Sequence, residues 1–258
     1  MEIKFFKYQG TGNDFVMLDN RQNDISLKQK QIEFLCDRKF GIGADGLILL
    51  ENHPDFDFKM LYYNSDGRES SMCGNGGRCL TKFAHDLKII REEYHFIAID
   101  GEHKAKLIGN EISLQMIDVL SIEEIKNDVF LDTGSPHHIV FEKKIGELEL
   151  VKTAREIRYS DSYKKEGVNV NFVEIDGEAS LNMRTYERGV EDETLSCGTG
   201  VTAAVLAANY RGLTQSNKVE VNTKGGRLYL SFTELDGVYK DIWLQGPVEF
   251  VFEGKIKI

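Results

Sequence analysis

The sequence has 258 residues and a net charge of −10, with 41% hydrophobic and 29% charged residues. A chain of this length can bury a large core, as one domain or as two. The acidic excess argues against a nucleic-acid surface, where a basic stripe is expected. No apolar run approaches the ~20 residues of a membrane-spanning helix, and residues 1–13 lack the apolar core of a secretory signal. We therefore expect a globular cytoplasmic protein with no nucleic-acid or membrane partner.

Most of the chain is predicted to form β-strands. Short or alternating runs of β-branched and aromatic residues are typical of strands. Such runs lie at residues 4–8, 15–18, 56–62, 95–99, 111–116, 168–175, 179–186, 219–221 and 228–232. The segment Thr223-Lys-Gly-Gly-Arg227 predicts a hairpin turn between the last two runs.

One helix is predicted near the N-terminus. Ser26 and Gln29 have the spacing of a capping box, which typically opens a helix. The apolar stripe that follows consists of Ile32, Leu35 and Cys36. This stripe predicts that Cys36 is an ordinary core residue, and we expect the same of Cys79.

Two further helices are predicted after two cysteines that lie nearly half the chain length apart. The segments Glu69-Ser-Ser-Met-Cys73-Gly-Asn-Gly76 and Glu193-Thr-Leu-Ser-Cys197-Gly-Thr-Gly200 are near copies of each other. After each cysteine, apolar residues recur at i, i+3, i+4 and i+7, which is typical of an amphipathic helix. Arg211 and Gly212 form a stop signal for the second helix.

The start of a helix favours anions, because its first backbone N–H groups have no partner within the helix and its dipole is positive there. A cysteine at this position is more readily ionised than an ordinary thiol. The Gly-Asn and Gly-Thr amides after Cys73 and Cys197 could also hold a ligand carboxylate or phosphate. Two such thiols facing one substrate would form a two-base device.

The usual signatures of metal and nucleotide sites are missing. Cys73 and Cys79 have the spacing C-x5-C, and the chain contains neither C-x-x-C nor H-E-x-x-H. It also lacks a phosphate-binding G-x-x-x-x-G-K-[ST] loop and a G-x-G-x-x-G segment that opens a helix after a strand. We expect no metal and no cofactor.

The predicted elements indicate an α+β fold of two related lobes. Residues 117–128 are acidic and loosely patterned, so we place a boundary near them. The N-terminal lobe then comprises residues 1–118 with Cys73, joined by a C-terminal strand at 249–258. The C-terminal lobe comprises residues 119–248 with Cys197.

Several segments, taken in order along the chain, resemble the diaminopimelate epimerase family. They are Gly10-Thr-Gly-Asn-Asp-Phe15, Asn64 before Asp66-Gly67, Met72-Cys-Gly-Asn-Gly76, Pro136-His137, Asn169-Val-Asn171, Glu187-Arg-Gly189 and Cys197-Gly-Thr-Gly200. The resemblance implies two similar lobes, each a curved, mostly antiparallel sheet wrapped around a central helix, with the active site in the cleft between them. It also implies conversion of LL-2,6-diaminopimelate to the meso isomer without a cofactor, in lysine and peptidoglycan synthesis.

The resemblance assigns roles to particular residues. Cys73 and Cys197 would exchange the roles of base and acid, and His137 and Glu187 would support them. Arg188 suits the distal carboxylate of a diamino dicarboxylate, because its planar fork can bind a carboxylate through two hydrogen bonds. The expected substrate contacts are Asn13, Asn64, Gly74, Asn75, Asn169, Glu187, Arg188, Gly198 and Thr199.

The chain departs from the family pattern at three places. One is the segment from Glu187 to Glu193, which is one residue longer than the commonest family spacing of glutamate to cysteine. The family commonly has Gly-Asn-Pro-His where this chain has Gly134-Ser-Pro-His137, so Ser135 would replace an asparagine contact with a shorter side chain. Gly46 stands where some members carry a polar side chain near the substrate. Glu69 and Glu193 are expected to orient the thiol loops or to cap the helices that follow.

Two other functions remain open. A proline or hydroxyproline racemase would also use paired C-G-x-G thiols, but it needs no arginine for a second carboxylate, so Arg188 discriminates between them. Alternatively, Cys73 and Cys197 would form a reversible disulfide in a thiol redox or binding protein. A homodimer is the default expectation for an enzyme of this kind.

Overall fold

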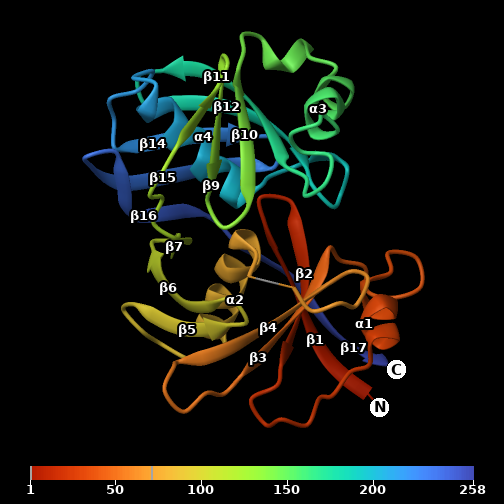
Figure 1. Cartoon of the computed structure of the whole chain (residues 1–258). Coiled ribbons are helices and arrows are strands. Elements are labelled where there is room, and N and C mark those ends of the chain that lie inside the picture. The colour runs from red at the N-terminus through yellow and green to blue at the C-terminus, as the bar shows by residue number, and fades with distance from the viewer. Residues whose placement is uncertain (1, 71) are drawn as a thin grey trace. The chain divides into compact units, whose positions relative to one another are not determined.

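The computed structural model describes residues 2–70 and 72–258, so Ser71 of the first cysteine motif lies outside the described residues. The chain divides into two compact units (Figure 1). Unit 1 comprises Met1–Leu114 and Gly246–Ile258, and unit 2 comprises Gln115–Gln245.

Unit 1 is a sheet of eight strands in the order β17-β1-β2-β3-β4-β5-β6-β7. The last strand of the chain, β17, therefore pairs with the first, β1, as Figure 1 shows. The strands are β1 (Glu2–Gly10), β2 (Asn13–Asp19), β3 (Gly46–Glu51), β4 (Phe58–Asn64), β5 (Tyr94–Ala98), β6 (Gly101–Ile108), β7 (Glu111–Gln115) and β17 (Glu249–Lys257).

Unit 2 also has a row of eight strands, in the order β8-β9-β10-β11-β12-β14-β15-β16. A short ninth strand, β13 (Asp192–Thr194), pairs with the end of β12. The eight strands are β8 (Glu123–Ile125), β9 (Asp128–Asp132), β10 (Pro136–Phe141), β11 (Asn169–Gly177), β12 (Ser180–Glu187), β14 (Lys218–Thr223), β15 (Gly226–Leu235) and β16 (Val238–Pro247).

The two rows have the same sequence of pairings. In each row the first two pairings are antiparallel, the third is parallel, the fourth antiparallel, the fifth parallel, and the last two antiparallel. Hence β2 corresponds to β10, β3 to β11 and β4 to β12. The two units are copies of one architecture, as expected for two similar lobes.

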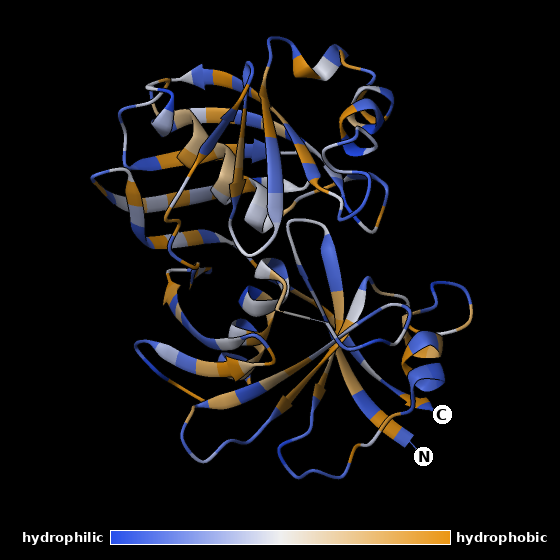
Figure 2. Cartoon of the chain, in the orientation of Figure 1, coloured by the Kyte–Doolittle hydropathy of each residue, from blue (hydrophilic) through white to orange (hydrophobic). Residues whose placement is uncertain are grey.

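Each unit packs its sheet against a 13-residue helix that begins directly after a cysteine. In unit 1 this is α2 (Gly74–Asp86), which contacts β1, β2, β3 and β6. In unit 2 it is α4 (Gly198–Tyr210), which contacts β9–β12, β14 and β15. Figure 2 shows α4 as largely hydrophobic, and its residues 200–208 are buried. Both predicted helices exist. The expectation that α4 is amphipathic was wrong, because consecutive residues on all of its sides are buried.

The predicted N-terminal helix exists, but its start was wrong. It is α1 (Gln29–Cys36), and its N-cap is Lys28 rather than Ser26. The Gln31 side chain accepts a hydrogen bond from the Lys28 N–H at 2.8 Å, so the capping box is shifted by two residues. Its buried side chains, Ile32, Leu35 and Cys36, pack on strands of unit 1 as expected.

A fourth helix was missed. It is α3 (Leu150–Arg158), a nine-residue helix whose buried side chains are Leu150 and Ala154. The strand prediction missed β3, whose run Gly-Leu-Ile-Leu-Leu-Glu is continuously apolar rather than alternating. It also missed β6, β8, β9, β10, β13 and β16. The hairpin at residues 223–227 is confirmed, since β14 and β15 pair antiparallel around it.

Candidate active site

Both motif cysteines are the N-cap residues of their helices. Cys73 has an extended backbone before α2, and its carbonyl accepts from the N–H of Gly77 at 2.7 Å. Cys197 has the same relation to α4, where the carbonyl accepts from Val201 at 2.9 Å. All four cysteines of the chain are free thiols, and Cys36 and Cys79 are core residues as predicted. The two candidate thiols thus lie at the positive ends of helix dipoles.

In unit 1, Cys73 is surrounded by side-chain amides. Its Sγ lies 3.6 Å from Oδ1 of Asn13, which is the first residue of β2. The same Oδ1 accepts from Nδ2 of Asn75, at 3.3 Å, from the first turn of α2. The structure therefore brings three of the predicted site residues into one cluster.

A charged network holds Asn13 from the other side. Its Nδ2 donates to Asp45 Oδ2 at 2.7 Å. Arg38 binds both Asp45 and Asp14, at 2.8 and 2.7 Å, and Lys7 pairs with Asp14 at 2.8 Å. Burial alone would raise the pKa of Asp14, but the hydrogen bonds and charges of Arg38 and Lys7 outweigh it and lower that pKa to about 2. Asp14 therefore stays ionised at neutral pH, and the network holds Asn13 in one orientation.

In unit 2, Cys197 faces a hydroxyl and a buried histidine. Its Sγ lies 3.4 Å from Thr199 Oγ1, which in turn lies 2.9 Å from His137 Nε2. Behind the ring, His137 Nδ1 lies 2.9 Å from Nδ2 of Asn171, and Asn171 Oδ1 accepts from Thr185 at 2.9 Å. This chain of contacts joins the predicted His137, Thr199 and Cys197.

The imidazole of His137 is neutral. Burial, with a smaller contribution from the positive charge of Arg188, lowers the pKa of His137 to about 3. Since Asn171 offers an N–H to Nδ1, the neutral ring carries its proton on Nε2 and donates it to Thr199. The Thr199 hydroxyl is then free to donate to the sulfur of Cys197. This arrangement stabilises a thiolate at that position.

The segment around Arg188 is held by Asn169. Asn169 Oδ1 accepts from the backbone N–H of Arg188 at 2.8 Å, and its Nδ2 donates to Ser135 Oγ at 2.9 Å. The exposed Arg188 side chain donates to the carbonyl of Glu166 at 3.0 Å. Through Asn169, the first residue of β11, Ser135 before β10 is linked to Arg188 after β12.

The remaining predicted residues occupy strand ends and turns. Glu187 is the half-buried last residue of β12, and Asn64 is the exposed last residue of β4, where its Oδ1 accepts from Tyr62 at 2.9 Å. Gly74 and Gly198 are the buried first residues of the two central helices. At Gly46, a Cβ would lie 2.6 Å from the Tyr62 ring, so this backbone leaves no room for a polar side chain.

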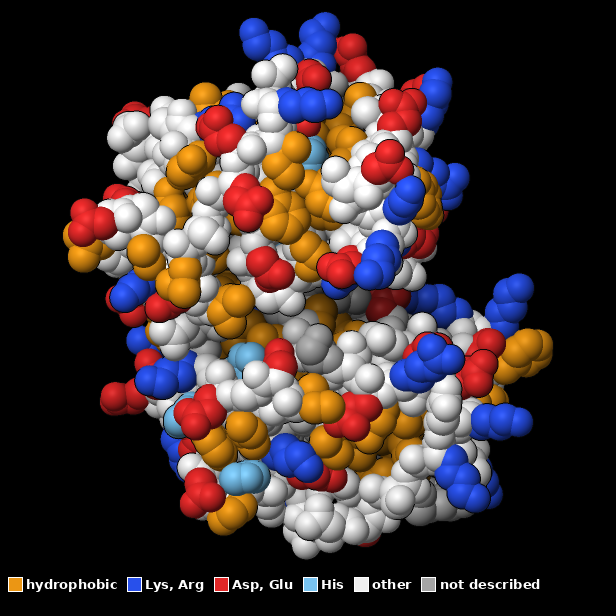
Figure 3. Space-filling model, viewed as in Figure 1, with side chains coloured by type: hydrophobic (Ala, Val, Ile, Leu, Met, Phe, Trp, Pro, Cys, Tyr) orange, Lys and Arg blue, Asp and Glu red, His pale blue; other side chains and the backbone are white. Residues whose placement is uncertain are grey.

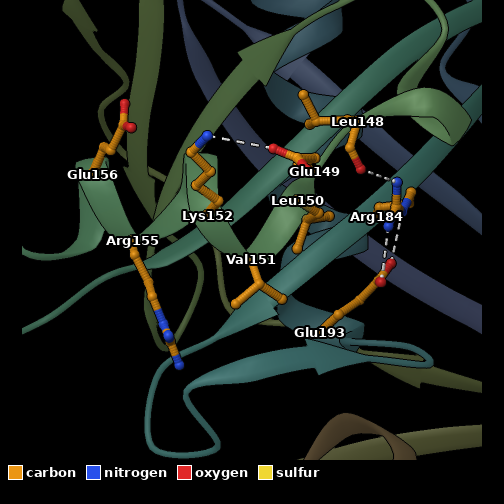
Figure 4. Close-up of a pocket in the computed structure, with 9 residues that line it drawn as sticks. All are labelled: Leu148, Glu149, Leu150, Val151, Lys152, Arg155, Glu156, Arg184 and Glu193. Carbon is orange, nitrogen blue, oxygen red and sulfur yellow. Dashed lines mark hydrogen bonds and ion pairs between the residues drawn. The ribbon is translucent and has the colours of Figure 1, made fainter.

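Glu193 is not a helix cap. It lies on β13, where it binds Arg184 at 2.7 and 2.9 Å and Lys224 at 2.6 Å. Figure 4 shows the Arg184–Glu193 pair at one side of a pocket in unit 2, which is lined by residues of α3, β12 and β13. None of the predicted catalytic residues lines this pocket. Glu69 forms an isolated bridge with Tyr63, the counterpart of the pairing between Glu193 and Tyr186.

Sequence reasoning missed several residues that hold the site. Asp45, Arg78, Asn171, Thr185 and Glu191 were not singled out. Glu191 binds Arg158 at 3.0 Å and the hydroxyl of Tyr159 at 2.8 Å, and so fixes the turn after Arg188. The similarity of Thr11-Gly-Asn-Asp-Phe15 to Thr133-Gly-Ser-Pro-His137 was available in the sequence and could have indicated equivalent strands.

Within residues 2–70 and 72–258, no group of three or more His, Cys, Asp or Glu side chains is arranged to hold a metal ion. No helix in the same part of the chain is long and apolar enough to cross a membrane. On the face drawn in Figure 3, Lys and Arg side chains are interspersed with Asp and Glu.

Comparison with known proteins shows the family to which the chain belongs. The family model described as diaminopimelate epimerase matches residues 5–114 and 129–251. The chain belongs to the diaminopimelate epimerase family. A diaminopimelate epimerase of Flavobacterium psychrophilum is 53% identical over 98% of this chain and 100% of its own length. That of Chlorobaculum tepidum is 41% identical over 96% of this chain and 99% of its own. The resemblance stated from the motifs is confirmed.

Solved structures that resemble this member of the diaminopimelate epimerase family share its fold at low sequence identity. A PhzF-family phenazine biosynthesis protein of Bacillus anthracis has a TM-score of 0.74, 14% identity and full coverage of both chains. A probable proline racemase of Agrobacterium radiobacter has a TM-score of 0.70 and 16% identity, and covers 99% of this chain and 93% of its own. The expected α+β fold is confirmed.

Proposed function

We propose that the protein is a cofactor-independent isomerase that converts LL-2,6-diaminopimelate to the meso isomer, in lysine and peptidoglycan synthesis. The observation that carries this proposal is the pair of equivalent cysteines, Cys73 and Cys197, each at the N-terminus of the central helix of its unit. Full-length relatives named diaminopimelate epimerase, at up to 53% identity among those compared, support the substrate.

The arrangement suits the chemistry that inversion requires. The hydrogen on an amino-acid Cα is very weakly acidic, so the carbanion formed when it leaves must be stabilised by fixed dipoles. The first amides of α2 and α4, at Gly74, Asn75, Gly198 and Thr199, would hold the α-carboxylate and receive its developing charge. In this proposal no group other than backbone and side-chain dipoles is needed.

Inversion also requires one base on each face of Cα. In the proposed reaction one thiolate removes the hydrogen and the other thiol delivers a proton to the opposite face, so each turnover exchanges their protonation states. In the forward direction the C–H bond breaks toward one sulfur and a new C–H bond forms from the other S–H. The neutral His137 and the hydroxyl of Thr199 support the sulfur of Cys197, and Asn13 supports that of Cys73.

The distal half of the substrate is assigned to polar residues at strand ends. Arg188 would bind the distal carboxylate, and Glu187 and the side chains of Asn64 and Asn169 would contact the remaining polar groups. Asn169 and Glu191 hold the backbone and the turn on either side of Arg188. This placement supports a substrate with a second carboxylate over proline or hydroxyproline.

The experiment that tests the function is direct. The purified protein is incubated with LL-diaminopimelate and no added cofactor, and the isomers are separated by chiral chromatography. We expect the meso isomer to accumulate to equilibrium, while L-proline and hydroxyproline stay unchanged. Inversion of proline, or no inversion of diaminopimelate, would overturn the proposal. A reversible disulfide protein would instead lose free thiols when purified without reductant.

We further propose that the enzyme acts in the cytoplasm as a homodimer. Enzymes of amino-acid synthesis take their substrates from the cytoplasmic pool, and closed two-fold dimers are the commonest assemblies of soluble enzymes. Light scattering behind size-exclusion chromatography would show the mass of one chain, 29.3 kDa, or of two. Cell fractionation with an antibody tests the location.

A further inference from the structure

Arg78 of α2 is a buried cation that forms no ion pair with a described residue, although the charge of Glu111 acts on it. Its side chain is 0% exposed, and among the described residues it forms no ion pair, while its Nε and Nη1 have no hydrogen-bond partner. Burial lowers the pKa of Arg78. A guanidinium in such a place is costly unless something nearby benefits from its charge or its hydrogen bonds.

The hydrogen bonds that Arg78 does make lead to the candidate site. Its Nη2 donates to Asn75 Oδ1 at 2.9 Å and lies 3.4 Å from Thr11 Oγ1. Since a guanidinium can only donate, Asn75 must turn its oxygen to Arg78 and its Nδ2 to Asn13. Asn13 in turn donates to Asp45, a carboxylate that can only accept. The two charged ends therefore fix the orientation of both carboxamides between them.

The charge of Arg78 is not cancelled by the other ionised groups near Asn13. Asp14 and Asp45 are negative, but Lys7 and Arg38 are their cationic partners. Asp100 accepts from the N–H of Met72 at 3.4 Å and from His103 at 3.2 Å, before the helix. Among the described residues near Asn13, Arg78 and the first N–H groups of α2 are positive groups that act on Cys73.

Unit 2 has no buried cation at the equivalent position of α4. The residue five positions after Cys197 is Thr202, which is buried and donates to the carbonyl of Gly198 at 3.1 Å. The polar residue behind Cys197 is instead the neutral His137. The two thiols therefore have different electrostatic surroundings in spite of matching motifs.

We propose that Arg78 is a positioning residue of the epimerase reaction, an inference that rests on the function proposed above. Its guanidinium fixes the carboxamides of Asn75 and Asn13 and favours an anion at the start of α2, which is the thiolate of Cys73 in the free enzyme. Asn13 Oδ1 accepts from Cys73 when the thiol is protonated. Arg78 lowers the cost of the ionised form, so Cys73 can serve as both acid and base.

The charge is tested by alkylation without substrate. Iodoacetamide labelling is followed separately at Cys73 and Cys197 by mass spectrometry across neutral pH, in the wild type and in Arg78→Met. We expect labelling of Cys73 at neutral pH to slow by about tenfold, the effect of one pKa unit, while Cys197 is unchanged. Cys36 is no interference, because burial raises its pKa to about 12, and burial also raises that of Cys79.

An unchanged Cys73 rate in Arg78→Met would overturn the charge effect. Equal slowing at both cysteines would overturn it too, since that pattern reports general loosening of the fold. Arg78→Lys keeps the charge but not the planar fork, so Cys73 labelling should stay near the wild-type rate. Its kcat on diaminopimelate should still fall by about tenfold, with a smaller change in KM, because Asn75 is no longer held.

Asp45→Asn changes the opposite end of the hydrogen-bonded series that runs from Arg78 through Asn75 and Asn13 to Asp45. This substitution does not alter the core, since the Asp45 side chain is 43% exposed. It should lower kcat without changing the melting temperature, and Asp55→Asn, on an exposed loop, is the matched control. A wild-type kcat in Asp45→Asn would overturn the positioning role. If the wild type is inactive on diaminopimelate, the proposed function fails, while the alkylation result still decides the role of Arg78.

Discussion

His137 occupies in unit 2 the position that Phe15 occupies in unit 1. Phe15 is in register with Gly46 across the parallel pair β2–β3, and His137 is in register with Asn169 across the equivalent pair β10–β11. Phe15 packs edge-on against the Tyr62 ring, at 6.0 Å between centroids. His137 instead bonds to Asn171 and Thr199. One unit therefore has an apolar contact where the other has a buried hydrogen-bond network that ends at a cysteine.

The buried His137 predicts a loss of stability in acid. Its pKa is about 3 in the folded protein and about 6.5 in an unfolded chain. Between these values the unfolded state binds a proton that the folded state does not, so the free energy of unfolding falls as the pH falls. The expected slope from this residue is about 1.4 kcal/mol per pH unit. Urea unfolding at a series of pH values should show a shallower slope in His137→Gln.

His53→Gln is the control for that series, because His53 lies on a loop of unit 1 outside the network. It should keep the wild-type slope. If His137→Gln and the wild type lose stability in parallel as the pH falls, the histidine is not buried in its neutral form.

Replacing either Cys73 or Cys197 by alanine should abolish inversion and leave the fold intact. A single thiol cannot both remove a proton from one face and supply one to the other. Circular dichroism and chiral chromatography check the two parts of this expectation. Alkylation should inactivate the wild type, and substrate should slow that inactivation. An active Cys197→Ala variant would contradict the two-base scheme.

The origin of the incoming proton is a separate test. If the new hydrogen comes from a thiol that has exchanged with solvent, early reaction in D2O should place deuterium in the product, while recovered substrate stays largely unlabelled. NMR of both isomers at low conversion measures this. Early labelling of unreacted substrate, or transfer of the original hydrogen to the product, would indicate a single base.

Arg188→Lys should weaken turnover of diaminopimelate although it keeps the charge. The planar, two-pronged contact with a carboxylate is lost, and we expect about 1 to 3 kcal/mol less transition-state stabilisation. The measurement is kcat/KM, and Arg227→Lys, at an exposed arginine of β15 that pairs with Glu220, is the matched control. An unchanged kcat/KM would remove the distal-carboxylate role from Arg188.

The sequence by itself determined the local features of this protein. A cysteine followed by glycines and then by apolar residues at helical spacing is enough to predict the start of α2 and of α4, because the spacing of apolar residues along a helix is a short-range property. Alternating strands such as β5 and β14 were predicted for the same reason. The repeated cysteine motif and the order of the other segments also identified the family.

Only the tertiary structure decided how the two thiols differ. The contacts of Arg78 with Thr11 and of His137 with Asn171 join residues 67 and 34 positions apart. Such contacts depend on strand register and on burial, which no local pattern encodes. The same holds for β3. Its residues are apolar without alternation because both faces of the strand are buried, and this burial is known only from the structure. The sequence therefore showed two near-identical cysteine motifs. Only the folded structure showed that the cation of Arg78 lies near Cys73 and that the neutral imidazole of His137 lies near Cys197.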